Sequence, residues 1–88
     1  MESKVIMEND RVRVVETLFR PNDKAPMHSH PDHLIYVLKS GRLKITTSGR
    51  TDVFDLKNGQ AIFFKAQSHE VENTGKTDVD LLVVELKK

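Results

Sequence analysis

The stretch HLIYVLKSGRLKITTSGRTDVFDL (His33 to Leu56) decides the fold of this chain. It holds three short runs rich in β-branched residues, and each gap between them carries a Ser-Gly pair that is typical of a tight turn. The first gap, Ser40-Gly41, predicts a hairpin between the first two runs. The first run, LIYVL, is apolar throughout, and its short length favours a buried strand over a helix segment. In the second run apolar and polar residues alternate, so one face of a strand carries Leu43, Ile45 and Thr47.

The same pattern extends toward both ends of the chain. A run at 11–19 alternates at first and stops at the loop RPNDKAP, which holds two prolines. After the central stretch, QAIFFK follows the turn residues Asn58-Gly59, and the chain closes with DVDLLVVEL at 78–86. No window shows the apolar spacing of an amphipathic helix. We therefore predict one all-β domain over 1–88, a single antiparallel β-barrel or jelly roll with roughly seven or eight strands and little or no helix.

Composition limits the partners of the chain. Lys+Arg 14 against Asp+Glu 13 gives a formal charge of +1, and the signs interleave, so we expect no nucleic-acid partner. The N-terminal segment lacks a signal-peptide pattern and no apolar run reaches about 18 residues, so we expect no membrane partner and a cytoplasmic location. A chain this short buries only roughly 60 to 65% of its unfolded surface, which favours a homodimer through sheet edges or an apolar sheet face. The expected contact segments are KVIM (4–7) and LLVVEL (81–86).

Three of the four histidines fall in the segment MHSHPDH (27–33), directly before the first central run. In a strand, His28 and His30 point to the same face and offer two imidazoles for chelation. His69 is the remaining histidine from a distant part of the chain, and the alternation of its neighbours aims it inward. Because the chain has no cysteine, nitrogen and oxygen must hold any metal, and a divalent Fe, Mn, Ni, Cu or Zn ion accepts such ligands. The alternative is that these histidines are surface or hydrogen-bonded structural residues.

Two motifs between Lys24 and Asn73 resemble those of the cupin superfamily. The first family motif reads His-x-His, then Glu, then Gly, and this chain has His28-Ser29-His30 followed by Gly41. The second reads Gly, then Pro-x-Gly, then His and Asn, and this chain has Gly59 followed by His69 and Asn73. The resemblance implies a small β-barrel whose interior holds one divalent metal, bound here by His28, His30 and His69.

The chain departs from both motifs. The glutamate of the first motif is missing. Counting residues from His30 or back from Gly41 puts its place at Leu34, whereas aligning the strand on the segment YVL puts it at His33. His33 is therefore a tentative fourth metal ligand. Its alternative role is that of a rim histidine beside Asp32, which holds a water or substrate at the mouth of the barrel. In the second motif, Lys65 and Gln67 stand where the family has Pro and Gly.

The missing glutamate has a chemical consequence. A divalent ion held by neutral imidazoles alone keeps its full positive charge, which attracts a small anionic chelator such as an enolate or a hydroxy acid. Within the cupin resemblance, all-histidine centres are similar to those of oxygen-dependent, dioxygenase-type enzymes. The alternative is a non-catalytic metal-binding, ligand-binding or sensor cupin, since a fold does not set a function. We assign no catalytic acid or base, and Tyr36, the only tyrosine, is a tentative pocket residue with packing as its other role.

Overall fold

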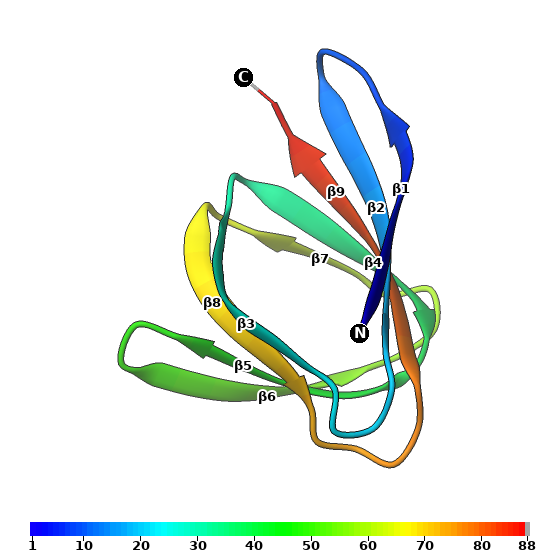
Figure 1. Cartoon of the computed structure of the whole chain (residues 1–88), viewed down its shortest axis with the longest axis vertical. Helices are drawn as coiled ribbons and strands as arrows, with labels where there is room; N and C mark the ends of the chain where they lie inside the picture. Colours follow the sequence, from blue (N-terminus) through cyan, green and yellow to red (C-terminus); the bar gives the residue numbers. More distant parts are fainter. Residues whose placement is uncertain (88) are drawn as a thin grey trace.

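The computed structural model describes residues 1–87, and all their regular structure is β (Figure 1). No helix in this part of the chain is long and apolar enough to cross a membrane. The strands, in chain order, are β1 (Glu2–Glu8), β2 (Val12–Phe19), β3 (Lys24–His30), β4 (His33–Lys39), β5 (Gly41–Thr47), β6 (Arg50–Leu56), β7 (Ala61–Phe64), β8 (Gln67–Asn73) and β9 (Val79–Leu86).

These strands form two antiparallel sheets that pack face to face as two layers (Figure 1). One sheet has five strands in the order β1-β2-β9-β4-β7, and the other has four in the order β3-β8-β5-β6. The predicted all-β jelly roll is therefore confirmed. The strands of residues 1–87 remain in two separate sheets, so the hydrogen bonding does not close into a single barrel.

The predicted hairpin at Ser40-Gly41 is wrong. Strand β4 pairs with β7 and β9, whereas β5 pairs with β6 and β8, so the chain passes from one sheet to the other at this point. Gly41 permits the crossing, because a Cβ atom there would lie 2.5 Å from Cγ2 of the buried Val79. The Ser48-Gly49 turn does make a hairpin, with Thr47 paired to Arg50 and Gly49 at a φ of 72°.

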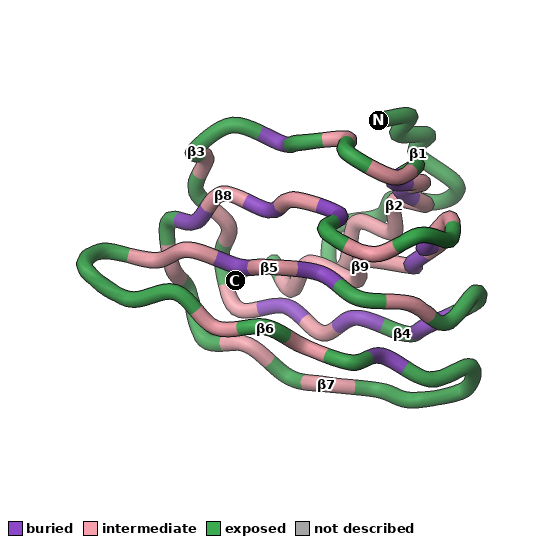
Figure 2. Tube along the Cα trace, turned by 90° about the horizontal axis from the view of Figure 1, so that it is seen from below, coloured by how far each residue is buried: buried purple, intermediate pink, exposed green. Residues whose placement is uncertain are grey.

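The core lies between the two sheets and follows the alternation of the sequence. Figure 2 shows buried positions alternating with more exposed ones along β4, β5 and β8. Each buried aliphatic side chain adds roughly 1.5 to 3 kcal/mol of apolar transfer free energy, and this burial holds the two layers together. The buried apolar side chains are Phe19, Ala25, Ile35, Val37, Leu43, Ile45, Leu56, Val71, Val79 and Leu81.

Asn73, at the end of β8, is fully buried and fixes the connections at one end of the sandwich. Its Nδ2 donates hydrogen bonds to the carbonyl oxygens of Phe19 (3.0 Å) and Thr77 (2.8 Å), and its Oδ1 accepts one from the Gly75 amide (2.9 Å). A buried amide with all these bonds made stabilises the loops that it joins. The motif asparagine therefore has a structural role, at the opposite end of β8 from His69.

Candidate metal centre

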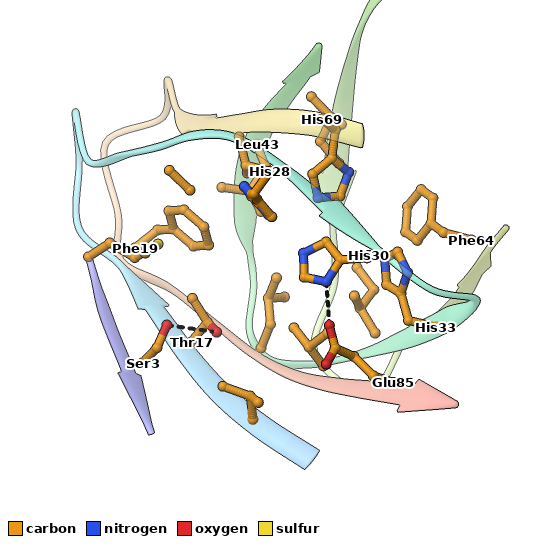
Figure 3. A pocket seen from close by; sticks show the side chains of 18 of the residues that line it. Ser3, Thr17, Phe19, His28, His30, His33, Leu43, Phe64, His69 and Glu85 are labelled. Carbon is orange, nitrogen blue, oxygen red and sulfur yellow. Dashed lines mark hydrogen bonds and ion pairs between the residues drawn. The ribbon is translucent and has the colours of Figure 1, made fainter. Parts of the chain in front are cut away.

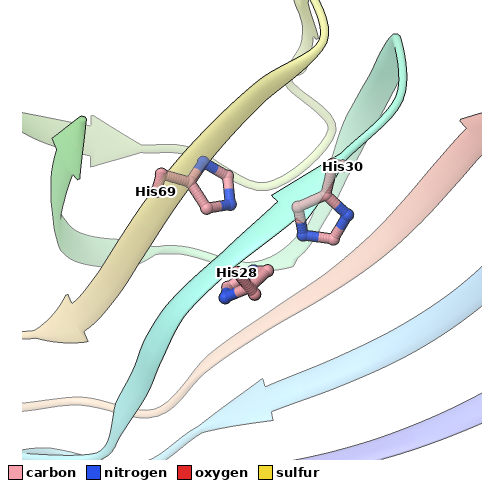
Figure 4. Close-up of side chains that lie close together, drawn as sticks. All are labelled: His28, His30 and His69. Atoms are coloured by element: carbon pink, nitrogen blue, oxygen red, sulfur yellow. The ribbon is translucent and has the colours of Figure 1, made fainter. Parts of the chain in front are cut away.

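The fold brings His28, His30 and His69 together (Figure 4). His28 and His30 lie on β3, and His69 lies on the neighbouring strand β8, directly opposite His28 in the register. The ring centroids are 4.5 Å apart for His28 and His30, 4.8 Å for His28 and His69, and 5.0 Å for His30 and His69. One nitrogen atom from each ring lies within 4.8 Å of the others, so these three residues form a group that could hold a metal ion.

The hydrogen bonds of the rings suit metal binding. Nδ1 of His28 lies 2.6 Å from the carbonyl oxygen of Pro26, and Nδ1 of His30 lies 2.5 Å from Oε2 of Glu85. Both acceptors require a proton on Nδ1, which leaves the Nε2 lone pair of each ring for a metal. Nδ1 of His69 is buried without a hydrogen-bond partner among residues 1–87. Three neutral imidazoles in this arrangement fit a divalent transition metal.

The centre also favours the uncharged imidazole that a metal requires. Burial, together with the neighbouring His28, His30 and His33, lowers the pKa of His69 to about 4. Burial likewise lowers the pKa of His30, although the hydrogen bond to Glu85 acts in the opposite direction. At neutral pH these two imidazoles are therefore uncharged, which is the form that binds a metal.

His33 and Leu34 lie on opposite sides of their sheet. His33 is only 2% exposed and stacks on Phe64 with ring centroids 5.4 Å apart, while Leu34 faces outward, paired with Phe63 and Val84. The cavity-facing position near the missing glutamate is thus His33. Its ring centroid lies 4.8 Å from that of His30 and 6.0 Å from that of His69, but it is not part of the group of three. Its role as a fourth ligand stays a prediction.

Glu85, near the end of β9, is hydrogen-bonded to His30 in the cavity (Figure 3). The sequence patterns did not predict this residue as part of the site. Oε1 of Glu85 lies 3.2 Å from Nη1 of Arg13, and its Oε2 accepts the short hydrogen bond from His30. Burial raises the pKa of Glu85, but the hydrogen bonds from His30 and Arg13 outweigh it and bring the pKa below the ordinary value. The centre therefore has a carboxylate beside it, although the family glutamate is absent. Alternation along β9 from Val79 was the available signal, since it places Glu85 on the cavity side.

A cavity of about 400 Å³ lies between the sheets, next to the three histidines. Most of its wall is apolar, and it includes Val15, Ile35, Ile45, Leu81, Val83 and Phe64. Among the described residues that line it, Glu85 is the only carboxylate and Arg13 the only guanidinium.

The structure corrects the expectation that Tyr36 lines the pocket. Tyr36 is 41% exposed and pairs with Leu82 and Ala61 on the outer face of the five-stranded sheet. Its neighbour Ile35 faces the cavity instead, because successive side chains of a strand point to opposite faces.

The loop before β8 is held by Asp32, which is not one of the defining residues of either motif. Oδ1 of Asp32 accepts a hydrogen bond from the Ala66 amide (2.7 Å), and the Asp32 carbonyl accepts one from the Leu86 amide (2.9 Å). Asp32 therefore ties together the β3–β4 connection, the β7–β8 loop and the end of β9. The segment that departs from the family Pro-x-Gly pattern is anchored in this way.

Comparisons with known proteins agree with this architecture. A family model described as "Cupin domain" matches residues 15–85. No curated protein matches the chain. Similar solved structures include a cupin domain from Bordetella pertussis Tohama I, with 25% identity and a TM-score of 0.91 over 99% of this chain and 93% of that chain.

One further similar structure is named as an enzyme, and another as a predicted enzyme. The polyketide cyclase RemF from Streptomyces resistomycificus has 26% identity and a TM-score of 0.73, over 98% of this chain and 64% of that chain. A predicted oxalate decarboxylase from Thermotoga maritima has 21% identity and a TM-score of 0.76, over 98% of this chain and 79% of that chain. The second likeness shows the fold alone.

Proposed function

This chain belongs to the cupin-domain family, and we propose that it is a metal-binding cupin in which His28, His30 and His69 hold one divalent transition metal. One observation carries the proposal: three imidazoles from two neighbouring strands converge, with their ligand atoms within 4.8 Å, beside an apolar cavity. When bound, such an ion supplies Lewis-acid chemistry and, if it is iron, copper or manganese, redox chemistry as well.

The cavity supports a small anionic chelator as the ligand. Its volume of about 400 Å³ suits a small molecule, and its mainly aliphatic and aromatic wall suits an apolar body. Three protein ligands leave coordination positions open, so an enolate or hydroxy-acid group is the end that would face the histidines. The ion pair with Arg13 offsets part of the negative charge of Glu85, so Glu85 repels such an anion less strongly than an unpaired carboxylate would.

Catalysis is the finer part of this proposal. We propose an oxygen-dependent, dioxygenase-type conversion of the chelated ligand, on the family resemblance of all-histidine centres. A specific observation favours the alternative of a binding or sensor protein: both oxygens of Glu85, the carboxylate that lines the cavity, already accept hydrogen bonds. These hydrogen bonds lower the pKa of the carboxyl group, so Glu85 is a weak general base.

Metal analysis of protein prepared without a histidine tag tests the proposed function. We expect about one equivalent of transition metal per chain, and titration of the metal-free protein with each candidate divalent ion should saturate at the same ratio. The control is the His28→Ala/His30→Ala double variant, which removes two of the three ligands. Binding of equal strength and ratio in both proteins would contradict the proposal. Oxygen uptake with a panel of β-dicarbonyl compounds then separates the enzyme from the sensor.

We also propose that the chain forms a homodimer through the outer face of the five-stranded sheet. The registers place four apolar side chains in one row across four strands: Val14, Val84, Leu34 and Phe63. Leu82 and Tyr36 form the next row, and Phe63 is 54% exposed. A contiguous apolar surface of this kind is typical of a protein interface.

A second copy of the chain is the partner that suits this face. β2, β9 and β4 hold seven or eight residues each and β7 holds four, so with a spacing of about 4.8 Å these strands cover roughly 20 by 20 Å. The half-exposed apolar residues of β1 extend the patch. A standard interface needs about 800 Å² of accessible surface per partner, which a corrugated face of this size approaches. Two acidic side chains of this face, Glu16 and Asp80, lie close to each other, and the registers place Lys4 and Lys39 opposite them, so basic groups are at hand to offset their charge when two copies meet.

Sedimentation velocity at micromolar concentration tests the dimer. We expect the wild-type chain to sediment as a dimer and Phe63→Glu as a monomer, because a charge in the apolar row would be buried unpaired in the interface. Val53→Glu is the matched control, since Val53 is 57% exposed on β6 of the other sheet and should leave the dimer intact. A monomeric wild-type chain, or a Phe63→Glu variant that remains dimeric, would contradict the proposed interface.

A further inference from the structure

Glu85 links the two sheets beside the candidate metal centre. It lies on β9 of the five-stranded sheet, and its Oε2 is 2.5 Å from Nδ1 of His30 on β3 of the other sheet. We propose that Glu85 is a positioning residue that supplies, from a different strand, a carboxylate beside the centre that lacks the motif glutamate. It holds His30 with Nε2 toward His28 and His69, and it places a negative charge next to the metal. This inference rests on the proposed metal-binding function.

The position of Glu85 is well defined by its surroundings. The side chains of His30 and Glu85 are only 19% and 14% exposed, so water screens their interaction less than it screens a surface ion pair. The backbone nearby is also tied down, because Glu85 pairs with His33 in the register and the next amide, of Leu86, donates to the Asp32 carbonyl. The carboxylate is thus held beside His30, although it does not belong to the group of three histidines that could hold a metal.

The contact has two separable chemical effects. As a hydrogen-bond acceptor, Glu85 keeps the proton of His30 on Nδ1, so that the Nε2 lone pair is available to a metal. As an anion, it makes the imidazole a more basic ligand and offsets part of the positive charge of the ion. A glutamine at this position keeps an acceptor oxygen but loses the charge, whereas an alanine loses both.

Arg13 positions Glu85 in turn. Its Nη1 lies 3.2 Å from Oε1 of Glu85, while its Nε lies 3.8 Å from Oε1 of Glu8, near the exposed end of the same cluster. Removing Arg13 frees Glu85 to rotate, but leaves the carboxylate in reach of His30. Removing the charge of Glu8 alters a group that does not touch His30, which makes Glu8→Gln the matched control.

Metal affinity, measured by competition with a chelator of known affinity, tests the proposal. We expect Glu85→Ala to bind the metal roughly 10 to 100-fold more weakly than wild type, with Glu85→Gln intermediate. Arg13→Gln should show a smaller loss in the same direction, and Glu8→Gln should stay within about twofold of wild type. Wild-type affinity in both Glu85 variants would overturn the proposal. Glu85→Gln preserves the size of the side chain, so the test survives if Glu85→Ala does not fold.

The tautomer of His30 gives a second readout that does not depend on metal. In the metal-free protein, long-range ¹H–¹⁵N NMR spectra should show the proton on Nδ1 in wild type and a shift toward Nε2 in Glu85→Ala, with Glu8→Gln unchanged. An Nε2 proton in the wild-type protein would overturn the positioning role. If the wild-type chain takes up no metal, the proposed function fails and the inference fails with it. If wild type and Glu85→Ala bind equally tightly, the inference alone fails.

Discussion

Replacing His69 by alanine is expected to lower the affinity of the chain for a divalent metal by at least about a hundredfold. The variant leaves two imidazoles on β3 and removes the ligand that β8 supplies from the opposite strand. Each bond of a chelating site supports the geometry of the others, so the loss exceeds that of one independent contact. His28→Ala and His30→Ala should show losses of the same order, because the three residues act as one unit.

The same chelator competition provides the control for this prediction. His33→Ala should weaken metal binding only modestly, because the His33 ring is adjacent to the group of three without belonging to it. Full retention of metal by His69→Ala under chelator challenge would show that the histidines do not share a site. A loss in His33→Ala as large as that in His69→Ala would instead make His33 a full fourth ligand.

In the metal-free protein, protonation of His69 is expected to lower the free energy of unfolding by about 3 kcal/mol as the pH falls from 6.5 to about 4. The pKa of His69 is lowered to about 4 in the folded chain, against an ordinary value near 6.5 in the unfolded chain. The unfolded state therefore takes up the proton first, so the full stability is present above pH 6.5 and is lost as the pH falls through this window. The groups that face His69 are His28, His30 and His33, and their influence is already included in the pKa of about 4.

Denaturant unfolding of wild type and His69→Gln between pH 7 and pH 4, with a chelator present, measures this contribution. The difference between the two unfolding free energies should shrink as the pH falls, because glutamine does not titrate. Titratable groups that do not interact with His69 cancel in the difference. One of them is Asp80, whose pKa is raised to about 6 by burial and by Glu16 and whose effect on stability has the opposite sign. Parallel pH curves for the two proteins would show that His69 is not buried as a neutral imidazole.

Sequence patterns on one strand proved to be good predictors. Alternation placed Leu43 and Ile45 on one face of a strand, and both lie in the core. It also placed His28 and His30 on one face of a strand. Patterns that depend on a neighbouring strand were less informative. The Ser-Gly pair at 40–41 looked like the hairpin turn at 48–49, yet one joins two sheets and the other joins two strands of one sheet.

The candidate site shows the same division. Tyr36 and Ile35 are both compatible with a buried run, and packing on β7 and β9 decided which of them faces the cavity. The choice between His33 and Leu34 was open for the same reason. Glu85 stood at an inward position of the last strand, but its contact with His30 depends on the distance between two sheets, which no local pattern contains.

The amino-acid sequence by itself determined the all-β class, the nitrogen and oxygen character of any metal site, and the shared face of His28 and His30. These properties depend on composition and on the two-residue period of a strand, both of which are local. The tertiary structure alone decided that His69 lies opposite His28 and that Glu85 reaches His30. Strand pairing and sheet packing are set by which apolar faces bury one another across the whole chain, so residues far apart in sequence meet only when the core forms.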